Sequence, residues 1–223
     1  MENKQTKSKQ RVVNHGEVFT AECEVNAMLN LIKHETERID SRFLEPACGN
    51  GNFLVEILRR KLAVVNSRYG KNADDYERYA VVAVSSIYGI DILQDNVEEC
   101  QSRLFTIFDS EYSTRCRKIA NNDTRDAVRF ILGRNILCGN ALTMKCNEDT
   151  SDEAPIVFSE WTSPDGYKIK RHEYIFAELL NDQTSSLFNS NDIHINDKGE
   201  SVFIPHSTGE YPPVHYRRVH LNE

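Results

Sequence analysis

The sequence predicts an α/β chain with a partial, mainly parallel β-sheet and a small β-hairpin extension toward its C-terminus. Three short apolar runs, at residues 43–44, 86–92 and 135–142, have the length and composition of buried strands. Longer stretches with apolar residues at helical spacing separate these runs. Because a parallel crossover needs a dozen or more residues, this alternation favours parallel pairing of the three strands.

Length and composition limit the domain organisation. A chain of 223 residues, 39% of them hydrophobic, is long enough for one α/β domain with a small appendage, so no second full domain is needed. We expect a disordered tail at residues 1–11, a cofactor-binding domain at residues 12–160 and a small α+β extension at residues 161–223. No apolar run approaches the ~18 residues of a membrane span, so no membrane segment is expected.

Cysteine content and charge bear on the compartment and the partners. The charged first residues have no apolar segment behind them, which is not the pattern of a signal peptide. The six cysteines form no Cys-x-x-Cys pair and no zinc-ligand spacing, so we expect reduced thiols in the cytoplasm and no metal site. With a net charge of −7, binding to nucleic acid would need a basic partner or a local basic patch. Four clusters could supply a patch, although each alone is typical of a solvated face: residues 59–61, 115–118, 168–171 and 217–218.

The helices are predicted from the spacing of apolar residues. Residues 22–37 form the first predicted helix, which Thr20 is placed to cap. A second helix begins at residue 53, directly after the first strand, and runs to about residue 65. Further helical stretches lie at residues 76–86, 95–108 and 125–132.

The link between the first strand and its helix has the layout of a nucleotide-binding loop. Gly49 and Gly51 can adopt positive φ and carry no Cβ, so a ligand can approach the backbone at the start of the helix. A dinucleotide fingerprint needs a third glycine, but Leu54 occupies that position. Glu45 precedes the loop, and its carboxylate would repel a pyrophosphate but attract a sulfonium or an amino group.

Residues 45–53, Glu-Pro-Ala-Cys-Gly-Asn-Gly-Asn-Phe, resemble the first motif of S-adenosylmethionine-dependent DNA methyltransferases of the adenine-N6 type. The resemblance implies a Rossmann-like class I methyltransferase fold with S-adenosylmethionine as the cofactor. It also implies that the loop contacts this cofactor through Glu45, Ala47, Cys48, Gly49, Gly51, Asn52 and Phe53.

Two further segments are similar to cofactor-binding segments of the same family. Residues 16–20 resemble its N-terminal Phe-Thr-Pro segment, with Thr20 kept and Ala21 in place of the proline. Asp91 ends the second predicted strand, where a carboxylate can accept both ribose hydroxyls of the cofactor. Ile92 would then pack on the adenine face.

The third predicted strand ends in Gly-Asn-Ala, where the family usually has Gly-Asp-Ala. The resemblance places Asn140 and Ala141 at the adenine of the cofactor. The amide oxygen of Asn140 can still accept a hydrogen bond from the adenine amino group, as the family's aspartate does.

The family's catalytic motif, Asn/Asp-Pro-Pro-Tyr/Phe, does not occur in the sequence. In the family this motif holds the exocyclic amine and stacks on a base flipped from the duplex. The next apolar run, residues 154–158, is followed instead by Ser-Glu-Trp. Either Glu160 accepts from the amine and Trp161 stacks on the base, or the site is incomplete and Trp161 is a core or edge aromatic.

Beyond residue 158 the sequence favours short elements. A short helix is expected at residues 174–180, and strands that form two hairpins are expected at residues 167–170, 193–195 and 201–204. These segments leave no room for the crossovers of a complete methyltransferase sheet, so the resemblance covers roughly residues 12–145. An incomplete sheet would leave an edge and an apolar face for a partner chain or a second copy in a homodimer.

The sequence therefore predicts an adenine-specific DNA methyltransferase-like protein of a restriction-modification or phage-defence system, with DNA as its substrate. Two alternatives stay open. In one, the chain is a catalytically incomplete subunit that binds cofactor or DNA and needs a separate specificity, catalytic or nuclease chain. In the other, it methylates a small molecule, RNA or protein.

Overall fold

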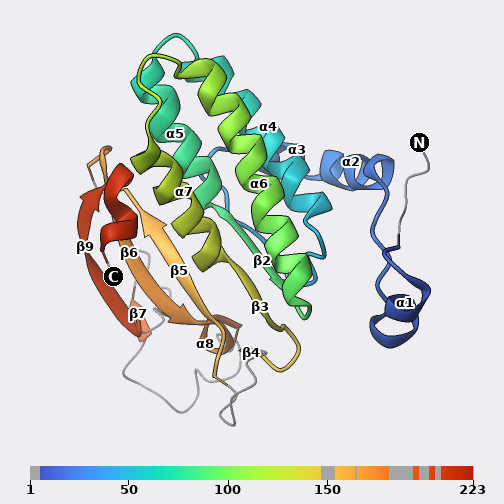
Figure 1. Ribbon diagram of the computed structural model, residues 1–223. Helices are drawn as coiled ribbons and strands as arrows, with labels where there is room; N and C mark the ends of the chain where they lie inside the picture. Colours follow the sequence, from blue (N-terminus) through green and yellow to red (C-terminus); the bar gives the residue numbers. More distant parts are fainter. Residues whose placement is uncertain are drawn as a thin grey trace.

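A four-stranded, mostly parallel sheet organises the fold (Figure 1), as the sequence predicts. β1 pairs with β2 and β2 with β3 in parallel, whereas the short β4 runs antiparallel to β3. In spatial order the strands are β1 (Phe43–Glu45), β2 (Ile87–Asp91), β3 (Ile136–Asn140) and β4 (Lys145–Cys146). This computed structural model describes residues 6–146, 154–163, 165–180, 193–195, 201–203 and 207–222.

Four long helices lie in front of β2 and β3 in Figure 1. On the first of them, Leu54, Leu58 and Leu62 recur at helical spacing and are buried. The third helix extends past the predicted end at residue 108 because Tyr112, one turn further, continues its buried stripe. The four helices are α4 (Asn52–Tyr69), α5 (Ala73–Ser85), α6 (Gln94–Arg115) and α7 (Asn122–Asn135).

A short helix precedes the domain where a tail was expected. α1 (Lys9–His15) includes the last residues of the predicted tail, residues 1–11. The Ser8 side chain caps the helix by accepting from the backbone N–H of Arg11. Residues 1–5 lie outside the described part of the chain.

The helix predicted at residues 22–37 is divided in two. α2 (Glu22–Leu31) and α3 (Lys33–Thr36) are separated by Ile32. The backbone of Ile32 leaves the helical region (φ −116°, ψ 33°) and interrupts the helix. Apolar spacing alone does not reveal such a one-residue break.

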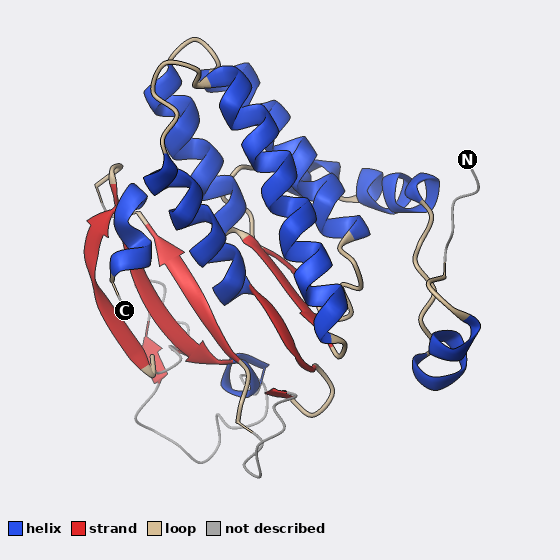
Figure 2. Ribbon diagram, in the orientation of Figure 1, coloured by secondary structure: helices blue, strands red, loops and turns tan. Residues whose placement is uncertain are grey.

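A separate antiparallel sheet follows the parallel one (Figure 2). Both predicted hairpins are present, but the extension is larger than two hairpins because a third strand joins the first of them. The sheet consists of β5 (Val157–Thr162), β6 (Lys168–Ile175) and β9 (Gly209–His215). The remaining elements are α8 (Phe176–Leu180), the hairpin of β7 (Ile193–Ile195) and β8 (Ser201–Phe203), and the 3-10 helix η2 (Tyr216–Leu221).

Two features of this region differ from the sequence prediction. β5 runs through the domain boundary expected at residue 160, because its alternating buried residues continue to Trp161. β9 was not predicted, since its Pro212 and Pro213 lack the N–H groups of a regular ladder. The strand tolerates them at the outside of the sheet, where its register with β6 shifts between Ile169 and Arg171.

The two sheets are joined by aromatic packing and one hydrogen bond. Tyr88 of β2 meets Phe158 of β5 edge-on, with ring centroids 5.5 Å apart. Its hydroxyl donates to the backbone oxygen of Ser159 at 3.0 Å. Burial raises the pKa of Tyr88, so this hydroxyl stays protonated as a donor. The antiparallel sheet is therefore anchored to the central strand of the parallel one.

A buried carboxylate ties the C-terminal helix η2 to the helical layer. Glu77 of α5 is fully buried and accepts from the hydroxyls of Tyr112 (2.8 Å), Thr124 (3.0 Å) and Tyr216 (2.8 Å). The guanidinium of Arg217 donates to the same carboxylate at 2.5 Å. Because Tyr216 and Arg217 belong to η2, this cluster fixes the end of the chain against α5, α6 and α7.

The basic clusters of the sequence are partly used inside the fold. Lys61 is fully buried, and its ammonium donates to the carbonyls of Ile39 and Ser41. Arg171 is 3% exposed and lies over the ring of Tyr211. Two of the candidate patches thus lose a member to the interior. None of the helices in the described ranges combines the length and hydrophobicity that a bilayer span requires.

Candidate functional site

A cavity of about 550 Å³ opens at the carboxyl ends of the three parallel strands. This edge is where open parallel sheets bind ligands. The cavity brings together eleven of the twelve residues predicted to bind the cofactor, and only Gly51 does not line it. The eleven are Thr20, Glu45, Ala47, Cys48, Gly49, Asn52, Phe53, Asp91, Ile92, Asn140 and Ala141.

The glycine loop has the backbone conformation that its sequence requires. Gly49 and Gly51 have φ of 53° and 89°, values that other residues adopt only with strain. A Cβ on Gly49 would lie 3.1 Å from the ring of Phe19. A Cβ on Gly51 would lie 2.5 Å from the sulfur of Cys100 on α6. Gly51 therefore allows α6 to approach the loop rather than lining the cavity itself.

Asp91 is hydrogen-bonded into the loop. Its Oδ2 accepts from the backbone N–H of Gly49 at 2.9 Å, which connects the end of β2 to the loop after β1. Its Oδ1 accepts from the N–H of Leu93 (2.9 Å) and from Nδ2 of Asn96 (3.1 Å). The carboxylate is 9% exposed and is fixed in direction by these three donors.

Two ionisable groups of the loop face the same cavity. Burial raises the pKa of Glu45, and among the residues that the structure describes its carboxylate has one donor, the backbone N–H of Ala47 at 3.4 Å. A partly buried carboxylate with so little hydrogen bonding is suited to bind a cationic group of a ligand. A hydrogen bond with Cys100 and burial raise the pKa of the Cys48 thiol, so Cys48 is a neutral wall residue and not a thiolate nucleophile.

Asn140 uses its side chain for a local turn. Its Oδ1 accepts from the backbone N–H groups of Leu142 (2.9 Å) and Thr143 (3.3 Å). The oxygen expected to accept from an adenine amino group is thus already engaged twice. Leu142 is 93% exposed and Ile92 is 45% exposed, so the mouth of the cavity has an apolar rim.

The N-terminal segment closes one side of the cavity through an ionic network. Glu17 accepts from Nε and Nη2 of Arg11 at 2.6 and 2.7 Å. Arg11 also donates to Asp95 of α6 at 2.6 Å, and this hydrogen bond lowers the pKa of Asp95 to about 2. Asn96 donates to Glu17 at 2.7 Å. The segment is therefore fixed to α6, directly beside Asp91.

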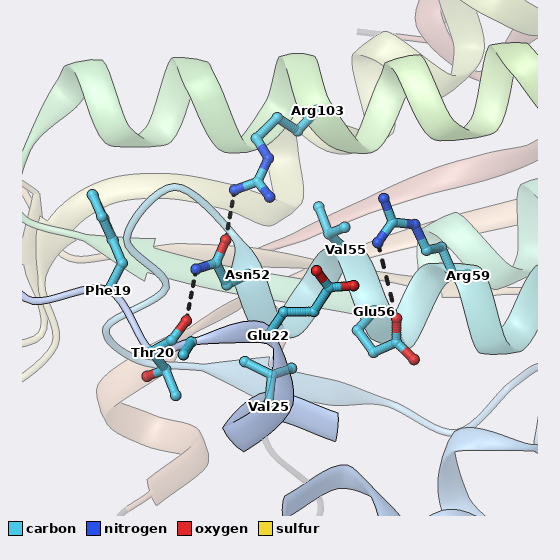
Figure 3. A pocket seen from close by; sticks show the side chains of 10 residues that line it. Phe19, Thr20, Glu22, Val25, Asn52, Val55, Glu56, Arg59 and Arg103 are labelled. Atoms are coloured by element: carbon cyan, nitrogen blue, oxygen red, sulfur yellow. Dashed lines mark hydrogen bonds and ion pairs between the residues drawn. The ribbon is translucent and has the colours of Figure 1, made fainter. Parts of the chain in front are cut away.

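A smaller cavity of about 210 Å³ adjoins the first (Figure 3). Asn52 stands between them: its Nδ2 donates to the carbonyl of Thr20 at 2.9 Å and its Oδ1 accepts from Arg103 at 2.9 Å. The side-chain amide of Asn52 thus joins the N-terminal segment, the loop helix α4 and α6. Its observed contacts are structural, although it also lines the larger cavity.

The structure does not bring the two catalytic candidates to the main cavity. Trp161 is 9% exposed, and its indole N–H donates to Oδ1 of Asn135 at 2.8 Å. Glu160 forms an ion pair with Arg42 at 2.5 Å and lines a different cavity of about 430 Å³ beside β1. We therefore do not assign Glu160 or Trp161 to the proposed site.

Two residues that the sequence did not assign to the site are Glu17 and Asn96. Glu17 lies within the segment of residues 16–20, but no motif distinguishes its carboxylate. Asn96 belongs to the helix expected at residues 95–108; it is 1% exposed and its amide contacts both Asp91 and Glu17. Asn96 is distinguished by being a polar helix residue whose side chain is buried, and its burial can be recognised only from the fold.

The fold and the cavity define an α/β domain that binds its ligand at the carboxyl edge of a parallel sheet, with a glycine loop at the start of a helix. Residues 19–162 match the family described as MmeI, DNA-methyltransferase domain, and the chain belongs to this family. No curated protein and no solved structure matches the chain. The matched range contains β1 to β5, including the whole glycine loop, so it supports a DNA methyltransferase.

Proposed function

We propose that this chain is an adenine-N6 DNA methyltransferase of a restriction-modification system, with a Rossmann-like class I core that binds S-adenosylmethionine in the 550 Å³ cavity. One observation supports the proposal above the others. The glycine loop is hydrogen-bonded to Asp91, through Gly49, at a cavity that also contains the carboxylate of Glu45.

Each part of the cofactor has a suitable partner in this arrangement. The ammonium of the methionine portion faces Glu45, whose carboxylate has little compensation from the protein. The ribose faces Asp91, and the apolar rim at Ile92 and Leu142 fits the adenine ring. Methyl transfer needs little acid or base assistance, so the contribution of these residues is to orient the sulfonium methyl toward the amine.

Titration calorimetry with S-adenosylmethionine and S-adenosylhomocysteine tests the cofactor site. We expect binding by the wild-type chain and at least a tenfold loss in Asp91→Ala. Glu98→Gln is the matched control, because Glu98 is an exposed carboxylate on α6 that does not line the cavity. No binding at millimolar ligand, or equal affinities in wild type and Asp91→Ala, would reject the assignment.

A second candidate function is a cofactor-binding subunit that completes its active site with another chain. The sequence contains no Asn-Pro-Pro-Tyr motif, and Glu160 and Trp161 lie away from the main cavity. β1 is also an outer strand among the described strands, so a further strand can pair there. The family match favours DNA over the small-molecule, RNA and protein substrates considered from the sequence.

Transfer of tritiated methyl groups to DNA separates the two candidates. The purified chain is assayed alone and together with the products of neighbouring genes. Activity of the chain alone would support a complete enzyme, and activity only in the mixture would support the subunit. Digestion of the labelled DNA to nucleosides then shows whether the label is on adenine N6.

A further inference from the structure

Asp91 has little remaining capacity to accept hydrogen bonds. A carboxylate offers about four acceptor positions. Within the described ranges, three protein donors already use it: Leu93 and Asn96 on Oδ1, and Gly49 on Oδ2. One position is left, on Oδ2. A ribose presents two adjacent hydroxyls, so Asp91 in this arrangement can accept only one of them.

Glu17 is a further carboxylate of the same cavity, placed beside Asp91 by a shared donor. The amide nitrogen of Asn96 donates to Oε1 of Glu17 at 2.7 Å and to Oδ1 of Asp91 at 3.1 Å. Oε1 also accepts from Nη2 of Arg11, whereas Nε of Arg11, at 2.6 Å, is the one donor that the described part of the chain supplies to Oε2. Glu17 therefore keeps a free acceptor position on Oε2 while lining the cavity.

The charge state of Glu17 suits this task. Its side chain is 7% exposed, and burial alone would raise its pKa. The hydrogen bonds from Arg11 and Asn96 outweigh burial and lower the pKa of Glu17 instead. The group is an ionised acceptor held in one direction, and Arg11 offsets the repulsion between the two adjacent carboxylates.

We infer that Glu17 and Asp91 divide the ribose diol between them, each accepting one hydroxyl, with Asn96 as the positioning residue that sets their separation. This inference rests on the proposed cofactor function. It assigns the N-terminal segment a direct part in binding, because Glu17 reaches the cavity from that segment and not from the sheet.

The test measures discrimination against ligands that lack one hydroxyl. S-adenosylhomocysteine and its 2′-deoxy and 3′-deoxy ribose analogues are titrated into wild type, Glu17→Ala and Glu98→Ala. In wild type, each deoxy analogue should bind at least about tenfold more weakly than the parent, the size expected for one charge-assisted hydrogen bond. Glu17→Ala should bind the parent and one of the two analogues equally, while still discriminating against the other.

Glu98→Ala controls for indirect effects. Glu98 is an exposed carboxylate on α6 that accepts from the Gln94 side chain and lies outside the cavity lining. This variant should keep the wild-type discrimination against both analogues. Thermal melting confirms that each variant is folded.

Several outcomes would overturn the inference. Glu17→Ala could weaken all three ligands by the same factor, which would mean that Glu17 only holds the N-terminal segment. The wild-type protein could discriminate against one analogue only, which would mean that a single acceptor binds the ribose hydroxyls. This outcome is measured on the wild-type protein and does not depend on whether any variant folds. If wild type does not bind S-adenosylhomocysteine at all, the proposed function fails together with the inference.

Discussion

Glu77 and Asp91 are both buried carboxylates that accept several hydrogen bonds, but they lie in different parts of the molecule. Glu77 lies within the helical layer at 0% exposure and joins α5, α6, α7 and η2. Asp91 lies at the end of β2, accepts three hydrogen bonds and faces a cavity of about 550 Å³. The number of donors is similar, so donors alone do not identify a binding residue.

The difference lies in the acceptor positions that remain: four donors fill those of Glu77, whereas Asp91 keeps one. The partners of Glu77 are hydroxyls and a guanidinium from three other elements, so its removal should affect folding. The partners of Asp91 include two backbone N–H groups, which fix its direction toward space that a ligand can fill. A buried acid that contacts only side chains is expected to stabilise the fold, and one held by the backbone at a cavity is expected to bind a ligand.

The largest expected effect is on the structural acid. Arg217→Ala leaves the carboxylate of Glu77 buried without its cationic partner, and we expect the free energy of unfolding to fall by about 3 kcal/mol. Chemical denaturation measures this change. Arg218→Ala is the control, because the neighbouring arginine is exposed and should change stability by less than about 0.5 kcal/mol.

Cofactor binding separates the two acids further. Folded Arg217→Ala protein should bind S-adenosylhomocysteine with wild-type affinity. A loss of affinity comparable to that of Asp91→Ala would show that the two carboxylates are coupled and would break the comparison.

The next effect tests the loop that holds Asp91. Gly51→Ala introduces a Cβ at φ 89° and within 2.5 Å of the Cys100 sulfur, so we expect a loss of about 2 kcal/mol in unfolding free energy. The double-mutant cycle with Cys100→Ala should show a coupling of roughly 1 kcal/mol, because removing the sulfur relieves the clash but not the backbone strain. Additive losses would indicate that the contact with α6 is unimportant.

A smaller effect concerns the pH dependence of binding. Glu45 has a raised pKa because of burial, so its carboxylate is protonated at a higher pH than an ordinary glutamate. Affinity for S-adenosylmethionine should therefore be full near neutral pH and decrease as the pH falls through this raised pKa. Glu45→Gln should bind about tenfold more weakly at neutral pH, without that decrease. Calorimetry at several pH values measures both, and an unchanged pH profile in Glu45→Gln would contradict the role.

The smallest effect separates a core tryptophan from a catalytic one. Trp161→Phe removes the hydrogen bond to Asn135 but keeps an aromatic ring against Phe130. We expect a stability loss of about 1 kcal/mol, measured by denaturation, and unchanged methyl transfer under saturating conditions. A loss of transfer without a loss of stability would return Trp161 to the active site.

The parallel core was predictable because its signals are local. The strands around residues 43–45 and 87–91, and the loop between Glu45 and Phe53, are encoded by consecutive residues whose type and order limit the backbone. The resemblance of that loop to a known motif identified the loop residues, all but one of which line the cavity.

The missing parts depend on contacts between distant segments. Glu17 and Asn96 are 79 positions apart in the sequence, and neither has a local pattern that indicates a shared site. The same holds for Glu77 and Arg217, which are 140 positions apart. β9 was missed for the opposite reason. Pro212 and Pro213 are a local signal against a strand, but pairing with the neighbouring β6 outweighs this signal.

Those two prolines also distinguish the margins of the two sheets. Among the described strands, β9 and β1 each have one side without a strand neighbour. Adjacent prolines remove two consecutive donors from β9, so an extended chain from outside cannot continue a regular ladder there. β1 contains no proline. A further strand can therefore pair with β1, beside the glycine loop, but cannot continue a regular ladder at β9.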